Sequence, residues 1–158
     1  MFAHDLATLA YFCHEVDRPS GMAVLPTMIA EGVALVTWSP TTLEAARKLA
    51  RETLSLGPPK LDQAAIRARC YALTDLATAL DSHRETRIRM AAGAALYSSL
   101  ADFALRAVNR WSASGKTLPR AIRAMDSDLA LRFESAFTSL IATGDVAAVQ
   151  ALDRKSVV

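Results

Sequence analysis

Cysteine is scarce in this sequence of 158 residues, which contains only Cys13 and Cys70. Two cysteines cannot form the disulfide framework that stabilises small secreted domains. The first residues place no basic segment ahead of an apolar stretch, so the sequence predicts no secretory signal. No apolar run approaches the roughly 18 to 20 residues that a membrane span requires. We therefore expect a cytoplasmic protein that does not associate with membranes.

An excess of charge of one sign is also missing. Lys and Arg number 18 and Asp and Glu number 16, which leaves a formal net charge of +2. Binding to nucleic-acid phosphates usually needs a clear basic surplus. Two tryptophans and three tyrosines offer few rings for stacking on bases. Nucleic acid is therefore not an expected partner.

Aromatic residues make up 6% of the sequence, whereas alanine contributes 31 residues and leucine 20. Alanine and leucine favour helices, and aromatic residues favour strands. This composition predicts a mainly α protein. The length fits one domain, or one lobe of a larger fold, with enough residues to bury a core.

Helical periodicity begins at residue 62 and continues to the end. Apolar residues recur there at spacings of three and four, as in Ile66, Cys70, Leu73, Ala77 and Leu80. Such spacing places them on one face of a helix. Further helices are expected over residues 84–111, 117–125 and 127–143, the last capped by Asp126, and again after Gly144-Asp145. Residues 41–158 are therefore predicted to form a bundle of about four or five helices.

The long helix expected over residues 84–111 has a slim middle. Gly93 lies there among four alanines, at positions 91, 92, 94 and 95. Small side chains let two helix backbones come close together. The sequence therefore predicts that a neighbouring helix approaches this one near Gly93.

Residues 1–40 have a different character. Five of the six prolines lie within the first 59 residues, and residues 32–37 form a short apolar run that predicts a strand. One strand cannot satisfy its own backbone hydrogen bonds, and the sequence supplies no sheet for it. We expect residues 1–40 to be the remnant of an α/β domain edge, with one strand and helices over 6–15 and 21–31, or to pair with a partner.

A capping box is predicted at the start of the following helix. Thr41 is the expected N-cap, and Glu44 is expected to reach back to its amide. The helix should then continue to about Leu54 and stop at Gly57 and the two prolines that follow it.

Two short motifs resemble parts of catalytic sites, but the residues around them argue against a catalytic role. Gly115-Lys116-Thr117 resembles the end of a phosphate-binding loop, but Arg110 stands where that loop needs a glycine. Asp126-Ser127-Asp128 has the spacing of a metal-binding pair, but a position between two helices favours Asp126 as an N-cap. Neither motif predicts a nucleotide or metal site.

Two groups of polar residues leave alternatives open. Arg110, Lys116, Arg120 and Arg123 could converge at one end of the bundle and bind a phosphate or a carboxylate, or they could form a solvated basic face. Asp75, with Tyr71 and Tyr97, could line a cleft. It could instead make a buried hydrogen bond to Arg69 or to a tyrosine hydroxyl.

Several segments together resemble the C-terminal part of bacterial nucleotidyltransferase-domain proteins, the superfamily that contains the aminoglycoside nucleotidyltransferases. The resemblance spans roughly residues 10–152. It is carried by Glu15-Val16-Asp17-Arg18-Pro19, Met28-Ile29-Ala30-Glu31-Gly32, Tyr71-Ala72-Leu73-Thr74-Asp75-Leu76, Asn109-Arg110-Trp111 with Lys116 and Arg120, and Ala142-Thr143-Gly144-Asp145. In that family, an α/β domain binds nucleoside triphosphate and magnesium, and a helical domain packs against it and helps to form the acceptor-substrate cleft.

This chain departs from the family at the catalytic signature, because the sequence contains no Gly-Ser dipeptide and its one Asp-x-Asp is the expected cap. The resemblance therefore implies a truncated, helical, substrate-side domain that does not transfer nucleotides alone. Magnesium and nucleoside triphosphate are implied only for the missing catalytic domain. We expect no catalytic residue and no metal ligand here. Contacts with substrate or a neighbouring domain are expected from Asp75, Asn109, Arg110, Trp111, Lys116 and Arg120.

The expected partner is a separate nucleotidyltransferase catalytic domain. The alternative is a noncatalytic protein-interaction module, or a homodimer, that buries the strand edge and apolar residues of its first segment.

Overall fold

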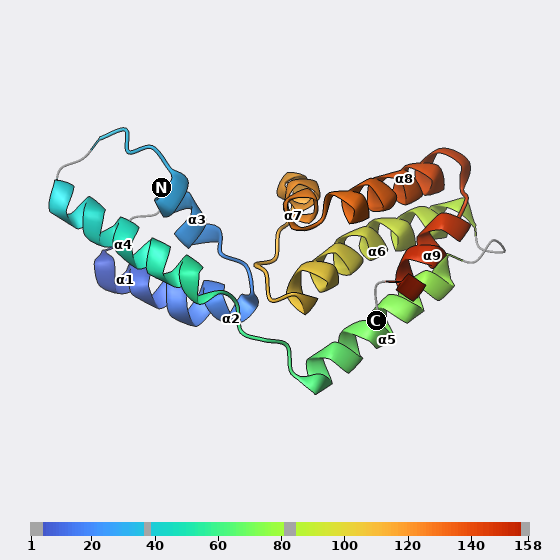
Figure 1. Ribbon diagram of the computed structural model, residues 1–158, viewed down its shortest axis with the longest axis horizontal. Coiled ribbons are helices and arrows are strands. Elements are labelled where there is room, and N and C mark those ends of the chain that lie inside the picture. Colours follow the sequence, from blue (N-terminus) through green and yellow to red (C-terminus); the bar gives the residue numbers. More distant parts are fainter. Residues whose placement is uncertain (1–4, 37–38, 81–84, 156–158) are drawn as a thin grey trace. The chain divides into compact units, whose positions relative to one another are not determined.

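The computed structural model describes residues 5–36, 39–80 and 85–155, and all regular secondary structure in these ranges is helical (Figure 1). The mainly α fold class is therefore confirmed. The chain forms two compact units. The first contains residues 1–60 with 109–112, and the second contains residues 61–108 with 113–158. The expected domain boundary at residue 40 stays a prediction.

The first unit begins with one continuous helical stretch. α1 (Leu6–Tyr11) leads through a π-helical turn (Phe12–Asp17) into α2 (Arg18–Ser20), which Gly21 ends with a left-handed φ of 79°. α3 (Val24–Glu31) and α4 (Pro40–Leu56) follow, and α4 packs against α1 and α3.

The interior of the first unit is small. Cys13, Ala50 and Thr53 are completely buried, and Leu9 nearly so. The Thr53 hydroxyl donates to the Leu49 carbonyl at 2.9 Å, so this buried polar group is satisfied within its own helix.

The predicted strand is wrong for every residue of it that the structure describes. Residues 32–36 are an irregular segment, and Val33, Leu35 and Val36 are 84%, 94% and 71% exposed. The described ranges contain no strand with which this segment could pair, and an unpaired strand leaves its backbone groups without partners. Residue 37 of the predicted strand lies outside the described residues.

The predicted capping box is also wrong in position. Ser39 is the N-cap of α4, and its hydroxyl accepts from the Thr42 amide at 3.3 Å. Pro40 takes the first helical position because it has no N–H to satisfy and its φ already suits a helix. Glu44 lies beyond the first turn and faces Arg47 at 3.5 Å.

The second unit is a bundle of helices joined by short connections. It contains α5 (Gln63–Ala79), α6 (Thr86–Ala107), a 3₁₀ turn (Gly115–Thr117), α7 (Leu118–Met125), α8 (Ser127–Thr143) and α9 (Ala147–Lys155). α5 packs against α6, and α8 packs against α6, α7 and α9. Their apolar faces bury one continuous core that includes Leu73, Leu96, Leu105, Phe133 and Val149.

Local capping explains where these helices start. Asp62 accepts from the Ala65 amide at 2.7 Å and begins α5. Asp126 accepts from the amides of Asp128 and Leu129, both at 2.9 Å, and begins α8. The predicted role of Asp126 as an N-cap is confirmed.

The end of α6 differs from the prediction. The helix stops at Ala107, and Asn109 adopts a left-handed φ of 58°. Residues 109–112 then belong to the first unit, where the Trp111 indole N–H donates to the Leu54 carbonyl at 3.1 Å and the Ser112 amide donates to the Gly21 carbonyl at 2.8 Å. These contacts with distant residues decide the end of the helix, and helical periodicity cannot reveal them.

Candidate functional site

The second unit contains a groove between α6 and α8, with a volume of about 710 Å³. The two helices run antiparallel along it. Gly144 lies beside Arg89, Leu140 beside Gly93, and the ring of Phe137 beside that of Tyr97. A single antiparallel alignment of α6 and α8 therefore places all of these residues along the groove.

Gly93 forms the floor of this groove. A Cβ at this position would lie 2.8 Å from Leu140 Cδ2, closer than side-chain atoms normally approach. The absence of a side chain thus lets Leu140 of α8 lie against the α6 backbone. The predicted close approach of a helix near Gly93 is confirmed.

The sides of the groove are apolar and open to solvent. Met90 on α6 is 66% exposed and Ile141 on α8 is 79% exposed, and both line the groove. Exposed single apolar residues are common on protein surfaces. Two that flank the same groove give it an apolar entrance.

An aromatic cluster closes one end of the groove. The ring centroids of Tyr97 and Phe137 are 5.0 Å apart at 83°, and Phe133 lies 4.9 Å from Tyr97. Burial raises the pKa of the Tyr97 phenol, and the charge of Glu134 raises it further. The Tyr97 phenol therefore holds its proton more tightly than a free tyrosine does, and its residue lines the groove.

Arg89 lies at the other end. Its guanidinium packs against Gly144, where an added Cβ would lie 3.4 Å from Nη1. Its Nε is buried and has no hydrogen-bond partner, and its Nη2 reaches the Thr86 hydroxyl only at 3.5 Å. Among the residues described, the groove thus joins an apolar length to one cation, Arg89, which is incompletely hydrogen-bonded.

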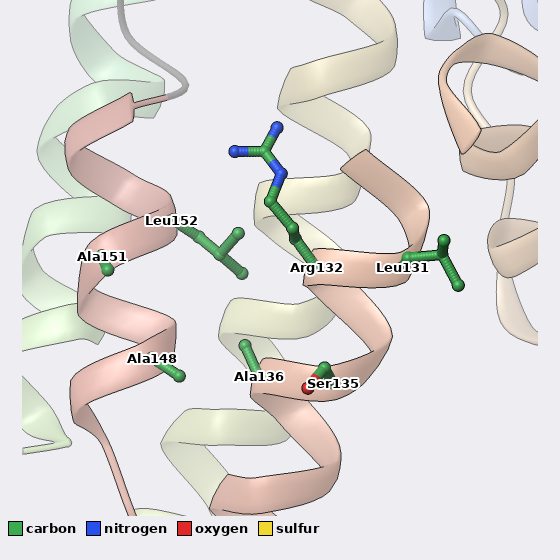
Figure 2. A pocket seen from close by; sticks show the side chains of 7 residues that line it. All are labelled: Leu131, Arg132, Ser135, Ala136, Ala148, Ala151 and Leu152. Atoms are coloured by element: carbon green, nitrogen blue, oxygen red, sulfur yellow. The ribbon is translucent and has the colours of Figure 1, made fainter. Parts of the chain in front are cut away.

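A second, smaller hollow of about 420 Å³ lies between α8 and α9. Figure 2 shows Leu152 of α9 pointing toward α8, and Ala136 and Ala148 lying on the facing sides of the two helices. Leu131 points away from α9 in the same view. The groove between α6 and α8 is larger and combines several chemical groups, so we take it as the candidate site.

The residues expected to contact a ligand are divided between the two units. Asn109, Arg110 and Trp111 belong to the first unit, whereas Asp75, Lys116 and Arg120 belong to the second. The Trp111 indole N–H is engaged by Leu54. Trp111 therefore has a structural role in the first unit, whatever else it contacts.

Asp75, Lys116 and Arg120 are exposed and lie on different elements of the second unit. None of them lines the groove between α6 and α8. The buried hydrogen bond considered for Asp75, to Arg69 or to a tyrosine hydroxyl, is wrong, because Asp75 is exposed. Arg69 pairs with Asp102 instead. Arg123 is also committed elsewhere: its Nη2 donates to both carboxylate oxygens of Glu134, at 2.7 and 2.9 Å.

Sequence reasoning missed Arg89, Met90 and Ile141 as residues of a site. Arg89 was one of several arginines on the long helix. It lies four residues before Gly93, on the same helix face, whereas Arg87 does not, but this spacing was not used. The small residues around Gly93 were the one usable signal, because they mark where α8 approaches.

Fold and groove together define a mainly α-helical protein with an apolar, ligand-sized groove in its second unit. Over the described ranges, no group of three or more potential metal ligands comes together, and no helix is both long and apolar enough to cross a membrane. Comparisons with protein-family models, with curated proteins and with solved structures found no match to this chain.

Proposed function

We propose that this chain is a helical accessory domain that acts on the substrate side of a nucleotidyltransferase-like enzyme and does not transfer nucleotides by itself. The observation that carries this proposal is the groove between α6 and α8, whose volume of about 710 Å³ suits a small ligand. The resemblance of the sequence to the helical domain of that family supplies the enzyme class.

The residues that the structure describes do not fit magnesium and nucleoside triphosphate. Asp126, the first carboxylate of the one Asp-x-Asp sequence, accepts two backbone amides as the cap of α8. Those lone pairs stabilise the helix and are not directed at a metal ion. In this proposal, a separate catalytic domain binds the magnesium ion and the nucleoside triphosphate.

Within this proposal, Asp75, Asn109, Arg110, Trp111, Lys116 and Arg120 are contacts with substrate or with the catalytic domain. Replacing Arg110 with Ala should weaken such a contact and leave the melting temperature nearly unchanged. An equal loss of stability would show that Arg110 is structural.

The direct test is nucleotide transfer measured with labelled ATP and magnesium. We expect no transfer by this chain alone and faster transfer by a catalytic domain encoded beside it when the chain is added. Ala94→Phe, which fills the groove, should abolish the stimulation, whereas Ala95→Phe, an exposed position outside the groove, should preserve it. Transfer by the chain alone, or no stimulation, contradicts the proposal.

A second candidate function is a noncatalytic interaction module or homodimer. It is favoured by the apolar segment of the first unit, where Val33, Leu35 and Val36 are largely exposed. Such a segment is a ready contact for another protein surface. Light scattering should then find a dimer that Leu35→Asp dissociates, and a monomer at all concentrations excludes the homodimer.

A further inference from the structure

We propose that the groove between α6 and α8 binds an amphipathic anion, with its apolar body along the groove and its single carboxylate at Arg89. This inference rests on the proposed function in one respect, because both place a ligand in the groove between α6 and α8. It adds the chemical class of the ligand.

The dimensions of the groove suit an elongated ligand. Its α6 side extends from Thr86 to Tyr97, which at about 1.5 Å per residue is a length of about 16 Å. Its volume of about 710 Å³ falls within the roughly 300–1,000 Å³ of small-molecule sites. A flexible alkyl chain fits this shape better than a compact, polar ligand does.

The lining explains the apolar body of the ligand. Met90, Leu140 and Ile141 present aliphatic surface, and Gly93 leaves the floor without a side chain. Met90 and Ile141 are largely exposed. Covering them with an alkyl chain removes apolar surface from water, which stabilises the complex.

Arg89 explains the anionic headgroup. No carboxylate among the described residues forms an ion pair with it, whereas the neighbouring Arg87 pairs with Glu85 at 2.6 Å. A guanidinium can donate two parallel hydrogen bonds to one carboxylate. Nη2 of Arg89 makes only a long hydrogen bond, 3.5 Å to the Thr86 hydroxyl, and is therefore a donor that a bound carboxylate would engage.

The helix ends at this position do not cancel the charge of Arg89. α8 ends at Thr143 and contributes partial negative charge, while α6 begins at Thr86 and contributes partial positive charge. Each end is equivalent to about half an elementary charge, of opposite sign. Arg89 is the charged residue among those that line the groove, so its charge favours an anion over a neutral or cationic headgroup.

The test compares dodecanoate with dodecanol by isothermal titration calorimetry, below the concentration at which either aggregates. We expect dodecanoate to bind the wild-type chain about tenfold more tightly, the ratio that one favourable charged contact gives. Arg89→Leu should remove this preference and leave dodecanol binding unchanged, and Arg89→Lys should restore part of it. Arg87→Leu is the matched control and should keep the wild-type ratio.

Partial unfolding of a variant weakens its binding of dodecanoate and of dodecanol by the same factor. The ratio of the two affinities therefore does not depend on the stability of the variant. Ala94→Phe should abolish the binding of both probes, and Ala95→Phe should abolish neither.

Equal affinity for the two probes, or a preference that survives Arg89→Leu, overturns the anion site. Binding of neither probe also overturns it, while the nucleotide-transfer assay still decides the proposed function. A dimer dissociated by Ile141→Asp would mean that a second copy covers the groove, which overturns the inference too.

Discussion

The two units of this protein bury their apolar residues in different ways. The second unit has one continuous core shared by α5 through α9. The first unit buries few side chains, among them Leu9, Cys13 and Ala50, and leaves the apolar side chains of residues 33–36 exposed. Stability rises with the apolar area that a fold removes from water. The second unit is therefore the better-packed body, and the first has apolar surface left for contacts.

The largest expected effect is a loss of stability when a side chain is removed from the core of the second unit. Phe137 is 3% exposed and packs against Tyr97 and Phe133. Replacing it with Ala leaves a cavity, and we expect a loss of about 3–5 kcal/mol in the free energy of unfolding. Urea denaturation measures it. Ile141→Ala, on the same helix but exposed, should change the value by less than about 0.5 kcal/mol. Similar losses at both positions would show that the groove side is packed as tightly as the core.

A smaller effect concerns the cap of α8. Asp126→Ala removes the acceptor of two backbone amides, and we expect a loss of about 0.5–2 kcal/mol. Asp128→Ala, which removes only a favourable charge in the first turn, should cost less. Thermal unfolding of both variants compares them, and an equal cost would contradict the capping role.

A third prediction concerns how the stability of the two units depends on pH. Burial raises the pKa of the Cys13 thiol in the first unit, with a further rise from Asp17 and an opposing effect of a hydrogen bond with Thr53. The folded chain thus holds this proton more tightly than the unfolded chain. The resulting stability is complete below the ordinary thiol pKa of 9.0 and is lost as the pH rises through the raised value.

Unfolding measured from pH 7 to pH 11 should therefore show an alkaline loss of stability that Cys13→Ala reduces. Tyr97 acts in the same direction in the second unit, from its ordinary pKa of 10.0, so Tyr97→Phe should reduce the loss only at the higher end. A Cys13→Ala profile identical in shape to the wild-type profile would contradict the prediction.

The smallest expected effect is at the surface of the second unit. Arg123 and Glu134 form an ion pair, but their side chains are 62% and 38% exposed. Pairs in such positions contribute about 0–1 kcal/mol. A double-mutant cycle with Arg123→Ala and Glu134→Ala should give a coupling in that range, which decreases in high salt. A coupling well above it would show that α7 and α8 depend on this pair.

Sequence reasoning predicted the helices well where local signals set them. The end of α4 follows from Gly57, which has a φ of 68°, and the end of α8 follows from Gly144, with a φ of 75°. Glycine adopts these left-handed angles without steric cost. The start of α4 was misplaced because Ser39, Thr41 and Thr42 are all good caps, and only Ser39 combines with the proline at the first helical position.

The candidate site was far less predictable. Arg89 and Gly144 are distant in sequence, and only the antiparallel packing of α6 and α8 brings them together. The sequence did show that Gly93 lies in a slim stretch of helix. It did not show which helix would use that stretch, because any amphipathic helix with an aliphatic residue at the right position can do so.

The sequence by itself determined the mainly α class, most helix boundaries and the cap at Asp126. These depend on residues within one turn of each other, so the local chain contains all the information. The tertiary structure alone decided that residues 32–36 form no strand, that residues 109–112 join the first unit and that Arg89 ends an apolar groove. The first outcome follows from the lack of a pairing strand in the described part of the chain. The other two depend on partners far away in the chain, and the hydrogen bonds and buried surface that these provide exist only once the fold has formed.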